Sequence, residues 1–135
     1  MTNIKIKYPL LIIREKDENL YGLKKDIGLV SKGGEDFYKQ KMLIIDSQGN
    51  KFSVIKAELY GKAKLIDSLK YFQPMLQMNL ILEQIDIMSL KQVKEFIIEY
   101  INRKPKRWLS MGTVEDIAES INERSSISEL ANMFR

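Results

Sequence analysis

The chain has 135 residues, of which 44% are hydrophobic and 30% charged, values typical of one globular domain large enough to bury a core. It contains no His and no Cys, which excludes disulfides, zinc sites built from imidazole or thiolate, Cys nucleophiles and Ser-His-Asp triads. The net charge is +4, but it is unevenly distributed: residues 1–70 carry 14 basic and 9 acidic side chains, whereas residues 111–135 carry 2 and 5. This asymmetry predicts a basic body with an acidic C-terminal end.

The first 30 residues show short strand patterns. Ile alternates with Lys over residues 4–7, and Pro9 then predicts that this strand is an edge or bends. The apolar run Leu10–Ile13 is short and continuous, so it predicts a strand buried on both faces. Residues 20–30 predict one weak strand, with bulges or bends at its two glycines.

The clearest pair of strands covers residues 41–46 and 51–60. The four residues Ser47–Asn50 separate them and include Gly49, which can adopt the positive φ of a tight turn. We therefore expect a β-hairpin. Residues 61–73, closed by Pro74, fit either a short helix or an ordered connection.

A second alternating pattern begins at Leu76. The apolar side chains at positions 76, 78, 80 and 82 share one face, whereas Ile85 and Ile87 fall on the opposite parity. One extra residue near Glu83–Gln84 would restore the alternation, so we expect a β-bulge there.

The last third of the chain is expected to be helical. Ser89, followed three residues later by Gln92, forms a capping-box pattern, and Pro105 ends the helix that it starts. Thr113 and Ser126 are N-caps for two further short helices.

Strands followed by helices, rather than alternating with them, predict an α+β fold. We expect a twisted, mostly antiparallel sheet of about five or six strands with C-terminal helices packed on it, in a single domain over residues 1–135 that is strand-rich at 1–88 and helical at 89–135. No targeting pattern and no apolar stretch of about 20 residues is visible, which favours a cytoplasmic protein that does not bind membranes.

The second predicted helix carries an acidic ladder on its solvent side. Glu115, Glu119 and Glu123 are spaced i, i+4, i+8, with Asp116 beside them, and each like-charge pair costs about 0.2–0.5 kcal/mol in an isolated helix. These four residues either meet lysines of the basic body or bind a cationic partner. A second possible contact consists of acidic residues in predicted turns: Asp17, Glu18, Glu35 and Asp36.

A basic cluster with an adjacent aromatic ring follows the first predicted helix: Arg103, Lys104, Lys106, Arg107 and Trp108. Cations beside an aromatic ring can bind phosphates and stack a base. The structural alternative, which we favour, is that Arg103 and Lys104 complement the helix dipole while Trp108 packs at the edge of the core.

No catalytic constellation is evident. The glycines of Ser31–Gly34 lack the spacing of a P-loop, and nothing brings two carboxylates together as a glycosidase requires. We expect no catalytic residues, no metal and no cofactor.

Several segments occur in a recognisable order: Gly33–Gly34, Phe37–Tyr38, the hairpin Leu43–Phe52, a long strand, a Ser-capped helix, Trp108–Gly112 and two short acidic helices. This order resembles small α+β immunity proteins encoded beside bacterial polymorphic and contact-dependent toxins. The resemblance implies a non-enzymatic inhibitor that binds a cognate toxin domain and blocks its active site. The alternative is a small nucleic-acid-binding or regulatory domain that uses the basic cluster at 103–108.

Overall fold

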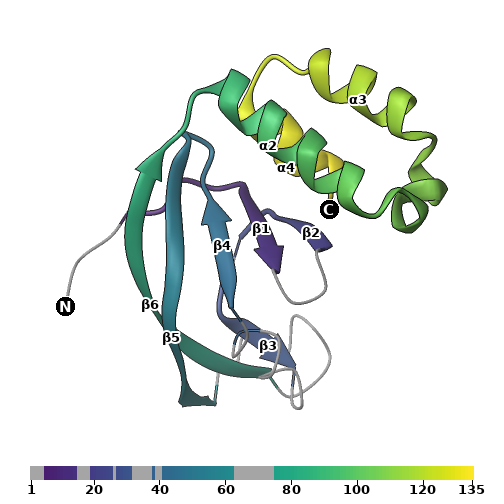
Figure 1. Ribbon diagram of the computed structural model, residues 1–135. Helices are drawn as coiled ribbons and strands as arrows, with labels where there is room; N and C mark the ends of the chain where they lie inside the picture. The colour runs from purple at the N-terminus through teal and green to yellow at the C-terminus, as the bar shows by residue number, and fades with distance from the viewer. Residues whose placement is uncertain (1–4, 15–18, 26, 32–37, 39–40, 63–74) are drawn as a thin grey trace.

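A six-stranded antiparallel sheet and a C-terminal group of helices make up the fold (Figure 1). The computed structural model describes residues 5–14, 19–25, 27–31, 38, 41–62 and 75–135. The strand order is β2-β1-β4-β5-β6-β3, and every neighbouring pair is antiparallel. The predicted α+β class is therefore confirmed. The strands are β1 (Leu10–Arg14), β2 (Asn19–Leu23), β3 (Leu29–Ser31), β4 (Met42–Ile45), β5 (Asn50–Lys62) and β6 (Met75–Ile87).

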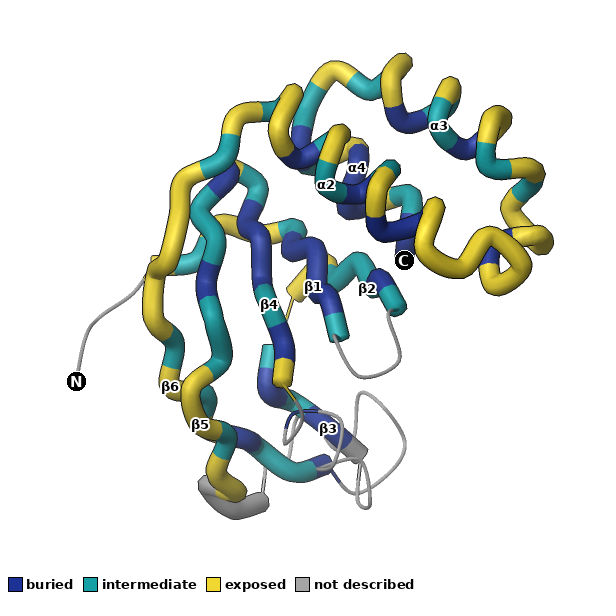
Figure 2. The backbone as a smooth tube through the Cα atoms, viewed as in Figure 1, coloured by how far each residue is buried: buried dark blue, intermediate teal, exposed yellow. Residues whose placement is uncertain are grey.

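β1 lies inside the sheet and is buried on both faces, as its apolar run predicts. Leu11 and Ile13 point to the face that the helices cover, whereas Leu10 and Ile12 belong to a second cluster on the other face. All four side chains are at most 1% exposed. Figure 2 shows β1 and β4 largely buried, whereas β5 and β6 are mostly half-buried or exposed.

The predicted hairpin is formed by β4 and β5. Gly49 has φ +87 in the turn, which an L side chain rarely adopts. Asp46, the residue before the turn, is fully buried. Its carboxylate accepts hydrogen bonds from the backbone N–H groups of Gln48 and Asn50, at 2.9 Å each. These hydrogen bonds compensate for the removal of the carboxylate from water.

The predicted bulge in β6 is present one residue beyond the expected place. Phe52 pairs with Gln84 and Lys51 pairs with Asp86, which leaves Ile85 as the extra residue. The bulge does not bury the apolar side chains that follow Glu83, because Ile85 and Ile87 remain 48% and 68% exposed.

Two strand predictions near the N-terminus are wrong. Residues 5–7 form no strand, and Ile4 lies outside the described residues. The stretch 20–30 is not one strand, since β2 and β3 lie at opposite edges of the sheet. Gly22 makes no bulge, because β2 pairs with β1 without a register shift. A Cβ atom at Gly22 would instead overlap the carbonyl oxygen of Ala131, so glycine permits the close approach in which its N–H donates to the carbonyl of Phe134 at 2.9 Å.

The segment 61–73, which fitted either a helix or a connection, is only partly described. Residues 61 and 62 end β5, and residues 63–74 lie outside the described ranges.

The helical part follows the predicted caps. Ser89 forms a complete capping box with Gln92, and Thr113 and Ser126 each accept a hydrogen bond from a backbone N–H three residues on. Lys104 is the C-cap of the first helix, and Pro105 begins the 3₁₀ helix that follows. The elements are α2 (Leu90–Arg103), η2 (Pro105–Met111), α3 (Val114–Asn122) and α4 (Ile127–Met133).

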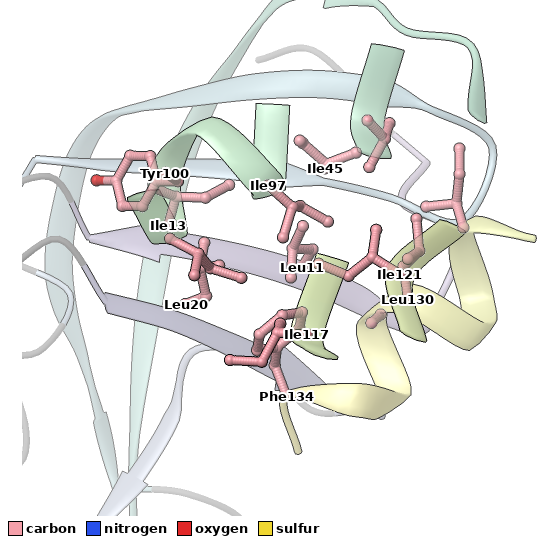
Figure 3. Close-up of a cluster of buried hydrophobic side chains, with 14 of the residues drawn as sticks. Leu11, Ile13, Leu20, Ile45, Ile97, Tyr100, Ile117, Ile121, Leu130 and Phe134 are labelled. Carbon is pink, nitrogen blue, oxygen red and sulfur yellow. The ribbon is translucent and has the colours of Figure 1, made fainter. Parts of the chain in front are cut away.

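The helices cover one face of the sheet over β2, β1 and β4 (Figure 1). Side chains from α2, α3 and α4 meet Leu11, Ile13 and Ile45 in the larger core cluster (Figure 3). No helix among the described residues is long and apolar enough to cross a membrane. This packing leaves the outward face of α3 and the β5–β6 side of the sheet at the surface.

Candidate partner-binding surface

The acidic ladder lies on the solvent-facing side of α3. Ile117 and Ile121 anchor the helix in the core and are at most 2% exposed. Their burial turns the opposite side of the helix outward. The side chains on that side are all exposed: Glu115, Asp116, Glu119 and Glu123. We call these four residues the acidic α3 surface.

The three glutamates of the ladder form no ion pair with any residue that the structure describes. The basic groups nearest in sequence or packing bind elsewhere. Lys94 Nζ donates to the carbonyl of Asn122 at 3.0 Å, and Arg124 Nη2 donates to Ser120 Oγ at 3.1 Å. Within the described ranges, therefore, lysines of the basic body do not neutralise this face.

The N-terminal end of α3 has a compensating contact, whereas the rest of the ladder does not. Thr113 Oγ1 accepts a hydrogen bond from the backbone N–H of Asp116 at 3.2 Å, and both Glu115 and Asp116 lie in the first turn. Negative charge there interacts favourably with the helix dipole. Glu119 and Glu123 lie beyond that turn, so the cost of their mutual repulsion is not offset in this way.

Two exposed apolar side chains precede this acidic face in the chain, and one of them, Met111, lies beside Asp116. Leu109 and Met111, on η2 immediately before α3, are 64% and 41% exposed. Met111 also lines an open hollow of about 280 Å³ on the surface of α3, together with Asp116, Ile117, Ser120, Arg124 and Met133. Exposed apolar groups beside a charged rim are typical of protein–protein interfaces. The arrangement can receive a partner that carries both cationic and apolar side chains.

The second acidic group cannot be placed. Asp17, Glu18, Glu35 and Asp36 all lie outside the described residues. The contact that they could form therefore remains a prediction from the sequence.

The basic cluster does not form the combined site that nucleic-acid binding would need. Trp108 is buried, and its ring packs edge-on against Phe134 with centroids 5.8 Å apart. The Arg103 guanidinium lies over the Tyr100 ring at 4.9 Å. A buried indole cannot stack on a base, so the structure separates Trp108 from the exposed cations Arg103, Lys104, Lys106 and Arg107. Trp108 therefore packs at the edge of the core, as the structural alternative to nucleic-acid binding predicts.

No group of three or more acidic side chains that could hold a metal ion occurs in the described ranges. Comparison with known protein families, characterised proteins and solved structures finds no match to this chain. The resemblance to immunity proteins therefore stays a prediction.

The apolar surface of the sheet was missed by the sequence analysis. Ile55 and Ile81 are 59% and 40% exposed on neighbouring strands β5 and β6. A signal was available for Ile81, because it shares its parity with the polar residues Asn79 and Glu83. The same parity places Ile55 with Lys51 and Ser53, but only the structure shows that Ile55 is the unpaired residue of a register shift between Val54 and Lys56.

Proposed function

We propose that this chain is a non-enzymatic, protein-binding inhibitor: an immunity protein that neutralises the toxic domain of a cognate bacterial toxin in the cytoplasm. The observation that supports this proposal is the acidic α3 surface, where Glu115, Glu119 and Glu123 are exposed and make no ion pair within the described residues. Like charges at this spacing lower helix stability. A cationic partner would remove that repulsion on binding.

Such a surface acts first on the rate of association. Clustered carboxylates produce a negative potential that steers a positively charged partner toward them, which accelerates encounter at low salt. The exposed side chain of Met111, which lines a hollow together with Asp116, then provides apolar area for the bound complex. Electrostatics would thus control the association rate, and apolar contact the lifetime of the complex.

The first test is co-purification of the chain with the product of the adjacent upstream gene. The second is stopped-flow binding to that product with the Glu119→Gln/Glu123→Gln variant. Glu95→Gln/Glu99→Gln is the control, because these two glutamates have the same spacing on α2 and are also exposed; it differs in that Glu99 lies 3.9 Å from Arg103 in an ion pair. We expect the α3 variant to associate several-fold more slowly at low salt, with a difference that shrinks as salt rises, and the control to change little.

The free proteins provide the internal check. The α3 variant should unfold at the same or a slightly higher denaturant concentration, because it loses repulsion and no described ion pair. Equal association rates at low salt would refute the assignment of this surface. Failure to retain the upstream product, together with a salt-dependent shift of generic RNA or DNA, would favour the nucleic-acid-binding alternative.

A further inference from the structure

Within the part of the chain that the structure describes, the outer edge of β6 has no partner strand over much of its length. β3 pairs with β6 only from Met75 to Gln77, and the N–H of Met78 donates to the carbonyl of Gly28 at 2.7 Å. Beyond that point, no strand among the described residues pairs with the outer side of β6. Figure 1 shows β6 as the outermost strand there. An open edge presents backbone N–H and C=O groups that can bind another strand.

The geometry of this edge is regular enough to pair. From Asn79 to Gln84 each residue of β6 has its own partner on β5, and the extra residue at the nearby register shift, Ile55, belongs to β5. Six regular residues match the usual length of a paired strand. The bulge at Ile85 then limits the accessible edge at its far end.

The side chains of this segment differ between the two faces of the sheet. Leu80 and Leu82 are half-buried on the face turned away from the helices, and both pack against the second core cluster. Ile81 and Glu83 are exposed on the other face. An added strand would therefore place one set of alternate residues beside leucines and the other set beside Ile81 and Glu83.

Charge distinguishes the possible occupants of the edge. Between Met75 and Ile87 the strand carries Glu83 and Asp86 and neither Lys, Arg nor Pro, although Lys and Pro are common protections of natural edges. Two-fold pairing with a second copy over Asn79–Gln84 would add a second Glu83 and no base from β6, so it would gain no charge complementarity. Lys56, opposite Ile81 on β5, is in an ion pair with Glu58 at 2.6 Å, so Glu83 is left to attract a cationic strand.

We propose that the outer edge of β6 at Asn79–Gln84 binds an extended segment of a partner protein in which apolar residues alternate with Lys or Arg. The segment pairs with the backbone as an added strand. Its apolar side chains lie beside Leu80 and Leu82, and a cation lies beside Glu83. This edge is well separated from α3 (Figure 1), so it is a different surface from the one assigned above.

A synthetic peptide tests the proposal directly. The probe is an eight-residue peptide of alternating Val and Lys, compared with a peptide that carries Glu in place of Lys and with one whose alternate backbone amides are N-methylated. Hydrogen exchange of the full chain, read by NMR, reports on residues 79–84. With the Val–Lys peptide at saturation, we expect exchange of the outward-pointing amides to slow by about tenfold or more, and neither comparison peptide to reproduce the effect.

Variants then identify the contribution of charge. Glu83→Lys should weaken binding of the Val–Lys peptide about two- to fivefold at low salt, with a smaller loss at high salt. Glu119→Gln/Glu123→Gln should bind the peptide like the wild type, which separates this proposal from the assignment of α3. Unchanged exchange at 79–84, or equal binding of the N-methylated peptide, would overturn the proposal. A concentration-dependent dimer that protects the same amides without peptide would assign the edge to a second copy instead.

Discussion

Gly49 joins the β4–β5 turn to the end of β6, and replacing it should destabilise the protein strongly. Its carbonyl accepts a hydrogen bond from the backbone N–H of Met88 at 2.7 Å, immediately before α2. A Cβ atom at this position would overlap the carbonyl oxygen of Met88 and come within 3.4 Å of Ile127 Cδ1. Gly49→Ala therefore perturbs a point at which the sheet meets the helices.

Two terms set the expected size of the effect. An L side chain in the left-handed backbone region costs about 1–2 kcal/mol, and Gly49 has φ +87. Relieving the overlap requires the backbone of Met88 to move, which weakens the hydrogen bond from its N–H to the Gly49 carbonyl; such a bond has a net contribution of about 0.5–1.5 kcal/mol. We expect a total loss of about 2–3 kcal/mol for Gly49→Ala and a larger loss for Gly49→Val.

Urea denaturation measures this loss. With an m-value of about 1.5 kcal/mol/M, the unfolding midpoint should fall by about 1.3–2 M. Gln48→Ala is the matched control, because Gln48 is exposed in the same turn and should change stability by less than about 0.5 kcal/mol. A Gly49→Ala midpoint equal to that of Gln48→Ala would refute the turn geometry and the approach to Met88.

Three further predictions follow from the helical part. Trp108 should show blue-shifted fluorescence that iodide quenches weakly, because its ring is buried; strong quenching that oligonucleotide relieves would contradict this. Ser89→Ala should cost about 0.5–2 kcal/mol by urea denaturation, because the N–H of Gln92 loses its acceptor. Hydrogen bonds from the N–H and hydroxyl of Ser125 lower the pKa of Glu129. Its stabilising effect is thus complete above the pKa of the unfolded chain and is lost as pH falls through the lower folded-state pKa. An NMR titration should place its midpoint below the usual value of about 4.3, and Ser125→Ala should raise it.

Elements that depend on neighbouring residues were predictable from the sequence. The capping box at Ser89, the N-caps at Thr113 and Ser126, and the turn around Gly49 all rest on hydrogen bonds or dihedral angles that span a few residues. The buried run of β1 was also predictable, because a strand with apolar residues on both parities cannot leave either face in water.

The site was predictable only in part. The i, i+4 spacing of Glu115, Glu119 and Glu123 placed them on one face of a helix, and the structure shows that face exposed. Whether lysines would neutralise it depended on how α3 packs on α2 and η2, which no local pattern contains. The same limit applies to Trp108, whose burial depends on its contact with Phe134, 26 positions later in the sequence.

By itself, then, the sequence determined the class of fold, the helix caps and the hairpin, because these follow from short-range periodicity and local hydrogen bonding. Strand order required the tertiary structure: β2 and β3, joined by only a few residues around Gly28, lie at opposite edges of the sheet. Among the described residues, the outer side of β6 lacks a partner strand over most of its length because β3 is only three residues long and pairs with Met75–Gln77 alone. Which edge is paired is decided by long-range hydrogen bonds and by the burial of whole faces.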